Sequence, residues 1–387
     1  MKTRSAGYIS FFACRNILKA VPAVIFLFFY ISGGTGGNAF ALELDFEGQL
    51  SGWTVESKVE NRWKNSSGIR YIPGLKLSRD TGSGNAFDSE LYINSFAASG
   101  PGTTGDNSDI DLYRANFRYT TTRSETSIGL QKINFGPAFV LRSLKWFDRL
   151  DPSDPLKLTE GVYGIRFRYD APDNSGCLAW VLYGNDETKG YEILPSTSEN
   201  IEAGGRIQRP LLSGDMAFTV HTRKVDGKSF HLPDFRETRY AVDGRWDMKV
   251  GLWFETVLQE QDSRINQYRW TKMITLGVDY TFDLGAGLYF LTEHMTTGGS
   301  EKIVGFEGEN LHTSAVQMSM PIGILDSISA IGYYSWENNR YSQYINWTRT
   351  YDNFQINAGF YYFPEAASYN YGMAGSRGIR IMLIFNH

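Results

Sequence analysis

Arginines spaced two or four residues apart are the feature of this sequence with the clearest chemical meaning. Arg114 and Arg118 share one alternating stretch, and Arg166 and Arg168 share another. Residues at these spacings lie on one face of a strand, so their guanidinium groups would be presented together. A ring of arginines around a pore lowers the barrier for anions and raises it for cations. The alternative is that these arginines pair with acids on neighbouring strands and only stiffen the wall.

The long polar break 134–159 separates these two stretches and has a pattern of its own. Spacings of three and four residues predict a short helix within it. If the chain encloses a lumen, this loop would narrow it, an interpretation we favour over a loop that lies across the mouth or contacts glycolipid phosphates. The predicted basic face holds Arg142, Lys145 and Arg149, and the apolar face holds Val140, Leu144 and Phe147.

Catalytic chemistry has little support. His221 is the best placed of five histidines for a general base, but a Ser-His-acid site needs side chains that meet in space. The sequence has no HExxH, CxxC or Gly-rich phosphate motif. Asp148, Asp151 and Asp154 could contribute to a Ca²⁺ site, although Asp-Pro is more typical of a turn. We predict no enzyme activity, no catalytic residue, no bound metal and no cofactor.

Strands must position these side chains, and alternating apolar and polar residues along the chain indicate where those strands lie. A period of two residues predicts strands with one apolar and one polar face. The mean hydropathy of −0.31 excludes a polytopic helical membrane protein, because each spanning helix needs about 20 consecutive apolar residues. The clearest alternating stretches are 42–50, 113–119, 163–169, 274–280, 284–290, 354–362 and 379–385.

The two faces of the predicted strands distinguish a membrane barrel from a soluble β protein. The apolar face carries tyrosine and phenylalanine near strand ends, as at Tyr113, Tyr280 and Phe385, which is typical of aromatic girdles at membrane interfaces. Backbone groups in lipid must all be paired, so the sheet has to close. The polar face is too rich in ionised groups for a dry core. Its members include Arg206, Arg245, Glu202, Asp243, Glu255 and Glu293.

Short and long breaks alternate along the chain, as they do in up-and-down barrels with tight turns at one rim and long loops at the other. We predict an all-β protein, a single closed antiparallel transmembrane β-barrel of about 18 strands. Sixteen strands is the alternative, because the segment 50–59 and the break 337–340 are hard to assign. A large secreted soluble β protein is the less favoured class.

The first 41 residues are predicted to be a cleavable secretory signal. Lys2, Arg4, Arg15 and Lys19 precede a twelve-residue apolar run, and an Ala-x-Ala pattern ends at Ala41. Cleavage would leave residues 42–387 as the barrel, with 34 basic and 42 acidic residues and a net charge of −8. An acidic chain argues against a nucleic-acid partner. One remaining cysteine, Cys177, cannot form an internal disulfide.

The residues after 41 resemble a Gram-negative outer-membrane β-barrel of the porin type. The last alternating stretch, 378–385, is similar to the terminal strand of that class, although Asn386 and His387 follow its final aromatic residue, Phe385. The segment 129–136 loosely resembles part of anion-channel and alginate-export-like barrels. The resemblance implies an outer-membrane location, with outer-membrane lipid and lipopolysaccharide as neighbours.

The expected function is a porin-like channel for small hydrophilic solutes with a possible anion bias. The sequence also leaves open an export barrel for an anionic polysaccharide, or a sleeve for a periplasmic or electron-carrying partner. A barrel enzyme is less favoured, because enzyme barrels are usually narrower. A homotrimer and a complex with a periplasmic partner are both compatible with the sequence. The candidate pore-lining residues are Arg114, Arg118, Arg166, Arg168, Arg142, Lys145 and Arg149.

Overall fold

A computed structural model describes residues 42–59, 62–82, 84–100, 107–150, 156, 158–262, 268–364 and 376–387. The predicted signal segment therefore lies outside the described residues. Eighteen strands form the main sheet: β1 (Glu43–Val59), β2 (Arg62–Gly82), β3 (Asn85–Ser99), β4 (Asn107–Thr120), β5 (Ser124–Gln131), β8 (Val162–Asp170), β9 (Gly176–Leu182), β10 (Glu202–Leu211), β11 (Gly214–Val225), β12 (Phe235–Asp247), β13 (Gly251–Gln261), β14 (Trp270–Phe282), β15 (Leu288–Ser300), β16 (Glu307–Ile322), β17 (Asp326–Ser335), β18 (Arg340–Thr350), β19 (Phe354–Tyr362) and β20 (Ser376–Asn386).

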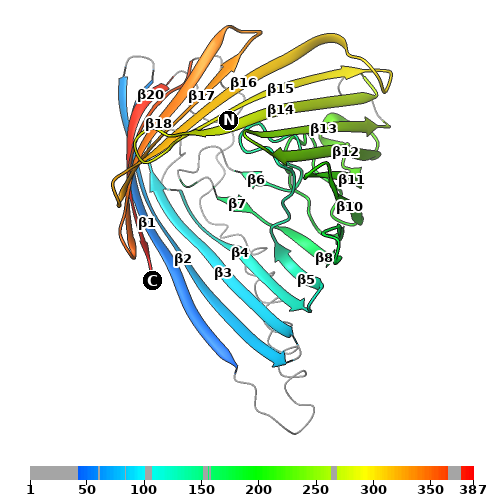
Figure 1. The fold of residues 1–387 in the computed structure, drawn as a ribbon, viewed down its shortest axis with the longest axis horizontal. Coiled ribbons are helices and arrows are strands. Elements are labelled where there is room, and N and C mark those ends of the chain that lie inside the picture. The colour runs from blue at the N-terminus through cyan, green and yellow to red at the C-terminus, as the bar shows by residue number, and fades with distance from the viewer. Residues whose placement is uncertain are drawn as a thin grey trace, which may run out of the picture.

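The main sheet is closed. Each strand pairs antiparallel with its neighbour in the chain, and β20 returns to pair with β1 from Gln49↔Asn386 to Val59↔Ser376. A separate two-stranded hairpin, β6 (Arg149–Leu150) and β7 (Thr159–Glu160), lies inside the ring of strands (Figure 1). The predicted closed antiparallel barrel and its count of 18 strands are both confirmed.

Side chains alternate between the two surfaces of the barrel as predicted. On β13, Trp253, Glu255 and Val257 are buried toward the inside, whereas Leu252 points outward and is 38% exposed. On β14, Thr275 is buried while Leu276 is exposed to the outside. Large apolar side chains thus cover the outer surface. A lipid bilayer around the barrel would remove this apolar surface from contact with water.

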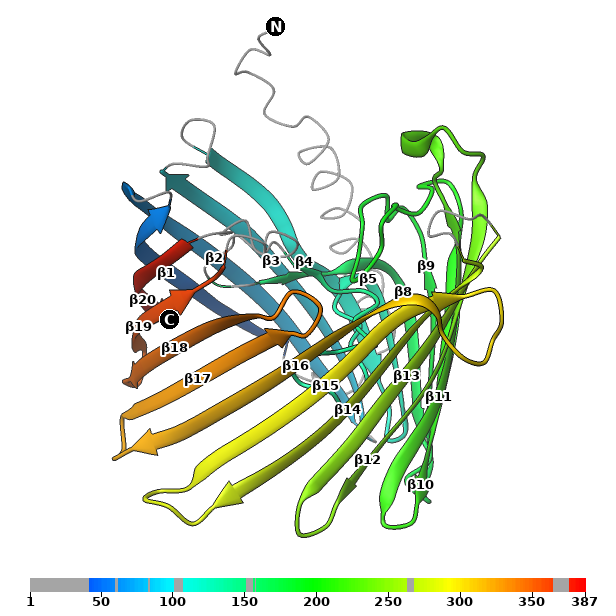
Figure 2. The same cartoon turned by 90° about the horizontal axis from the view of Figure 1, so that it is seen from above.

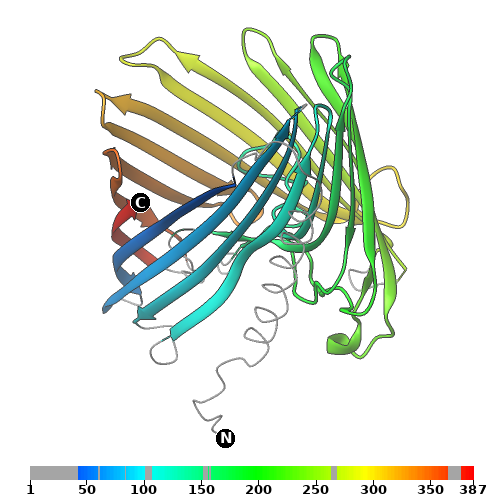
Figure 3. The same cartoon turned by 90° about the horizontal axis from the view of Figure 1, so that it is seen from below.

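Tight turns gather at one rim of the barrel and long connections at the other. In Figure 2 the tight hairpins β10–β11, β12–β13 and β14–β15 lie along the lower edge, and the 3₁₀ turn η1 (Lys228–Phe230) lies at the opposite edge. Figure 3 shows the same division from the other side. In the part of the chain that the structure describes, no helix is long and apolar enough to cross a membrane.

One predicted strand begins too early. The alternating stretch 284–290 was expected to be extended throughout, but Leu284 and Ala286 lie in the turn before β15, which begins at Leu288. Gly285 and Gly287 have φ values of +63° and +103°, which favour glycine and close the turn. In the sequence, the alternating glycines of this turn therefore give the same pattern as the polar face of a strand.

The end of the last strand explains its unusual sequence. His387 continues the ladder beyond β20, because its N–H donates to Gly48 O at 3.0 Å and Gly48 N–H donates to His387 O at 2.9 Å. The imidazole lies 5.5 Å from the ring of Phe46 and 6.1 Å from that of Phe385. His387 thus joins an aromatic group that also includes Tyr71, whose ring lies 5.9 Å away.

Candidate functional site

Two glutamates of the barrel wall hold the β5–β8 loop (residues 132–161) across the lumen. Glu255 on β13 and Glu293 on β15 are buried, and five backbone N–H groups of the loop donate to their carboxylates. These strands lie far round the ring from β5 and β8, so the loop crosses the interior (Figure 1). The donors are Ala138 (3.0 Å) and Leu144 (2.9 Å) to Glu255, and Phe139 (2.7 Å), Val140 (3.0 Å) and Leu141 (2.5 Å) to Glu293.

The helix predicted in this loop is wrong. Residues 132–148 form turns and irregular backbone. A helix would use its N–H groups for bonds to carbonyls four residues earlier, but here the N–H groups between Ala138 and Leu144 are directed at the wall carboxylates. Gly136, at φ +94°, turns the chain where a Cβ would lie 2.4 Å from a carboxylate oxygen of Glu255. The acids of the wall therefore determine the loop conformation.

Aromatic side chains give the loop an apolar core inside the barrel. Phe135 stacks on Trp180 of β9 with ring centroids 5.5 Å apart, and Phe147 meets the same indole edge-on at 5.5 Å. Trp146 packs edge-on against Phe135 at 5.6 Å. The sequence predicted that Leu144 and Phe147 belong to an apolar face, and both are buried here. This packing fixes the loop against β9 as well as against β13 and β15.

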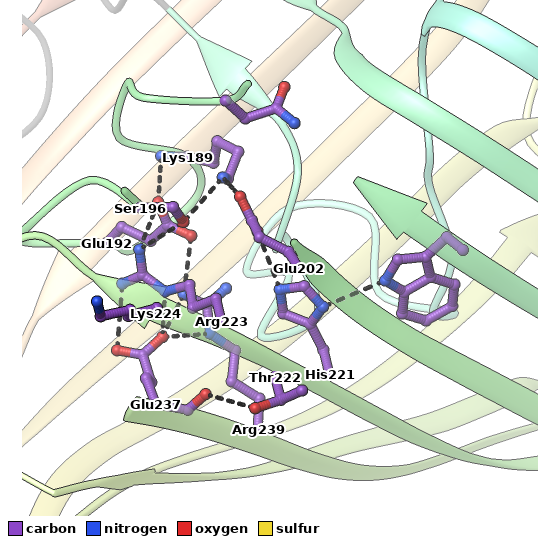
Figure 4. Close-up of polar contacts among 12 residues, drawn as sticks. Lys189, Glu192, Ser196, Glu202, His221, Thr222, Arg223, Lys224, Glu237 and Arg239 are labelled. Carbon is purple, nitrogen blue, oxygen red and sulfur yellow. Dashed lines mark hydrogen bonds and ion pairs between the residues drawn. The ribbon is translucent and has the colours of Figure 1, made fainter. Parts of the chain in front are cut away.

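A second connection, the β9–β10 loop (residues 183–201), is fixed to the wall by charge (Figure 4). The carboxylate of Glu192 is buried between two wall arginines, each of which also pairs with Glu237 of β12. The N–H of Gly190 donates to Asp148 O at 3.0 Å, which joins the two loops. The ion pairs are Glu192–Arg223 (3.2 Å), Glu192–Arg239 (2.9 Å), Glu237–Arg223 (2.7 Å) and Glu237–Arg239 (2.6 Å).

His221 belongs to this buried region rather than to an accessible site. The Nζ of Lys189 donates to Glu202 at 2.7 Å, and the second carboxylate oxygen of Glu202 lies 3.3 Å from His221 Nε2. The indole N–H of Trp180 donates to His221 Nδ1 at 3.2 Å. The side chain of His221 has no exposed surface. The histidine that the sequence placed best for a general base is therefore enclosed by packed side chains.

The four arginines predicted to line the pore from the strands belong to the barrel wall, but they do not form one ring. They are Arg114 and Arg118 on β4 and Arg166 and Arg168 on β8. Three of them lie beside an acid, which is the pairing alternative that the sequence left open. Arg114 instead donates to two backbone carbonyls, and the second of these fixes β7 to the wall. The partners are Asp88 for Arg118 (3.6 Å), Glu125 for Arg166, Asp170 for Arg168 (2.9 Å), and the carbonyls of Tyr113 (2.5 Å) and Thr159 (2.6 Å) for Arg114.

Two of the three basic residues predicted for the loop, Arg142 and Lys145, lie near the same acid, Asp148. Arg142 donates to Asp148 at 2.6 Å and to the amide oxygen of Asn134. Lys145 is half-buried, and this burial lowers the pKa of its ammonium group. Arg149 pairs through its backbone with Glu160, and its side chain lies outside the described part. Asp148 thus pairs with Arg142, and Asp151 and Asp154 lie outside the described residues.

Two cavities open on the tight-turn side of the β5–β8 loop, with opposite charge. The larger, of about 660 Å³, is net positive, and the smaller, of about 300 Å³, is net negative. The charged residues of the larger cavity, which we call the arginine cavity, are Arg166, Arg168, Arg206, Arg245, Asp170, Asp215 and Asp243. Those of the smaller cavity are Glu43, Asp45, Asp88, Glu90, Lys76 and Arg118.

Residues outside the predicted set complete the arginine cavity. Arg206 forms a two-pronged pair with Asp243 at 2.5 and 2.7 Å and lies over the ring of Phe135, 5.5 Å from its centroid. The guanidinium group of Arg245 lies over the ring of Phe139, 5.3 Å from its centroid. Strand alternation placed both arginines inside the barrel. Their contact with the loop could not be predicted, because it depends on where the loop folds.

Comparison with known proteins supports the fold. No family model and no curated protein matches the sequence. One similar solved structure is OccAB1 of Acinetobacter baumannii, with a TM-score of 0.57 and 9% sequence identity over 89% of this chain and 96% of that chain. Another is OccD3 of Pseudomonas aeruginosa, with a TM-score of 0.55 and 12% identity over 91% of this chain and 93% of that chain. An anion-selective porin of Comamonas acidovorans is also similar, with a TM-score of 0.50 and 12% identity over 90% of this chain and 100% of that chain. The fold of the chain, a closed antiparallel barrel of 18 strands, is thus similar to that of outer-membrane porins.

Proposed function

We propose that the protein is a passive channel in the outer membrane for small hydrophilic solutes. The observation that carries this proposal is the β5–β8 loop, fixed across the lumen by Glu255 and Glu293. A barrel of 18 strands is wide enough for a water-filled interior. A loop fixed across such an interior would narrow it. The polar inner surface and the apolar outer surface fit water on one side of the wall and lipid on the other.

An anion bias is the finer part of the proposal, and the arginine cavity supports it. This cavity carries four arginines against three aspartates directly beneath the loop. Arg168 is the most accessible of the predicted residues there, with 58% of its side chain exposed. Charges exposed to a wet lumen act on passing ions even when a neighbouring acid partly offsets them. Anions would therefore cross the lumen along the arginine cavity, and cations would cross it along the smaller acidic cavity.

Reversal potentials in a salt gradient test the bias. We expect the wild-type protein in planar bilayers to prefer chloride over potassium. The double substitution Arg166→Glu/Arg168→Glu should move the reversal potential toward cation preference, because it reverses two charges of the cavity wall. The control is Arg209→Glu/Arg236→Glu, which makes the same charge change at exposed residues on the outer face of β10 and β12. Equal reversal potentials for the wild type and the Arg166/Arg168 variant would refute the bias.

The export and sleeve alternatives remain hypotheses, and none of the described contacts favours them. Assembly as a homotrimer also remains a prediction. Native mass spectrometry of the detergent-solubilised protein checks it, since three copies of the barrel would give a single complex of three chain masses. A monomer under conditions that keep the barrel folded would contradict it.

A further inference from the structure

The inner wall formed by β16, β17, β18 and β19 differs chemically from the rest of the lumen. Side chains that point outward from these strands include Val316, Ile345 and Phe360, all large, apolar and exposed. The alternate positions, at 313–321, 327–335, 342–350 and 355–361, therefore face the lumen. None of those lumen-facing positions is acidic, basic or histidine. These positions form a sector that we call the neutral wall. Strands β13–β15 and β20 separate it from the strands that line the two charged cavities.

Amide and hydroxyl groups on the neutral wall form a continuous hydrogen-bonded ladder. It runs along β18 and β19 from the middle of the lumen toward the tight-turn rim. Each step joins two uncharged side chains. The bonds run from Tyr344 to Asn346 (3.1 Å), Asn346 to Thr348 (2.7 Å), Thr348 to Asn357 (2.8 Å), Asn357 to Gln355 (3.4 Å) and Gln355 to Thr350 (3.3 Å).

The ladder holds its groups in place without using all their bonding capacity. An amide carries two donor hydrogens and an oxygen with two acceptor sites, and a hydroxyl carries one donor and two acceptor sites. Asn346 and Thr348 are partly exposed. The amide of Asn346 donates to Thr348 and Asn357, and the hydroxyl of Thr348 donates to Asn357, so the sites that these two residues leave for the lumen are acceptors. Ser327 and Ser329 stand beside them, because Ser327 faces Thr348 and Ser329 faces Asn346 in the strand register. The wall thus presents acceptor sites of Asn346 and Thr348 beside the hydroxyl groups of Ser327 and Ser329, which can both donate and accept.

We propose that the neutral wall is a low-affinity track for uncharged polyhydroxylated solutes, meaning polyols and small sugars. Each solute hydroxyl both donates and accepts, which matches amide and hydroxyl groups in either orientation. An ion gains little along the ladder from Asn346 to Thr350, because the charge that contacts the ladder, Arg380 of β20, lies at its Tyr344 end. This inference rests on the proposed channel function and adds a solute class to it. Ions and polyols would then use different sectors of one lumen.

Xylitol uptake measured beside ion conductance tests this proposal. The variant Asn346→Leu/Thr348→Val/Asn357→Leu keeps side-chain size and removes the polar groups. Each net hydrogen bond contributes roughly 1 kcal/mol, so we expect xylitol-driven swelling of proteoliposomes to slow by at least about threefold. Potassium chloride conductance of single channels in planar bilayers should stay close to the wild-type value. The single variant Thr348→Val, which disturbs folding least, should slow swelling in the same direction.

The matched control is Gln343→Leu, which removes an amide from the outward face of the same strand and should leave both readouts unchanged. Unaltered xylitol uptake in the triple variant would overturn the proposal. So would an equal loss of uptake and conductance, because that result would mean a narrower pore. A wild-type protein with neither conductance nor uptake would instead refute the channel itself.

Discussion

Replacing Glu255 and Glu293 together by glutamine is expected to free the β5–β8 loop from the opposite wall. All four carboxylate oxygens accept loop N–H groups, and each glutamine replaces one acceptor by a donor that faces those groups. A hydrogen bond to a charged group contributes roughly 1.5–3 kcal/mol, so the loss of several such bonds should release residues 138–144 from β13 and β15. Single-channel recordings should show a larger conductance with frequent current interruptions.

Glu260→Gln is the matched control for this prediction. Glu260 is also on β13, but it pairs with Arg269 at 2.5 Å and does not contact the loop. We expect wild-type conductance from it. Wild-type conductance and noise in the Glu255/Glu293 variant would contradict the inference that these two acids hold the loop across the lumen.

Replacing Glu192 by glutamine is expected to release the β9–β10 loop. The substitution leaves Arg223 and Arg239 buried with Glu237 as their shared acid. Removing one partner of a buried ion pair typically costs about 3–5 kcal/mol. Lys189 is 1% exposed in the folded protein, so trypsin should cleave after it only in the variant. Mass spectrometry of trypsin-treated protein in lipid vesicles measures the cleavage.

The control for this experiment is Glu199→Gln, an exposed acid of the same loop. Cleavage after the exposed Lys228, which lies in the β11–β12 connection at the same rim as the β9–β10 loop, should be equal in all three proteins and shows that the protease was equally active. Protection of Lys189 in the Glu192 variant would show that packing alone, and not the ion pairs, fixes this loop.

The barrel could be predicted from the sequence because its rules are local. A period of two residues determines which face a side chain occupies, as for Thr275 inside and Leu276 outside. Closure follows from the need to pair every backbone group in lipid. The misplaced start of β15 shows the limit of this reasoning, since Gly285 and Gly287 alternate in a turn just as they would in a strand.

The site could be predicted only in part, because its contacts join distant segments. The β5–β8 loop lies more than 100 residues from Glu255 and Glu293 in sequence, and no local pattern links them. The spacing of Arg142, Lys145 and Arg149 therefore predicted a helix that the wall contacts prevent.

Arginine pairing depends on strand register in the same way. Arg166 lies directly opposite Ser127 and reaches Glu125 diagonally, so its partner is defined only once β5 and β8 are aligned. The sequence could place this arginine in the wall and offer both pairing and anion attraction as its role. Only the register shows that an acid stands beside it.

Single-channel recording of the purified wild-type protein in a planar bilayer tests the central claim most directly, namely that the lumen is an open water pathway narrowed by a fixed loop. We predict stable steps of current that rise linearly with voltage and show few interruptions. A correctly folded barrel that inserts into the bilayer and conducts no ions would contradict the claim.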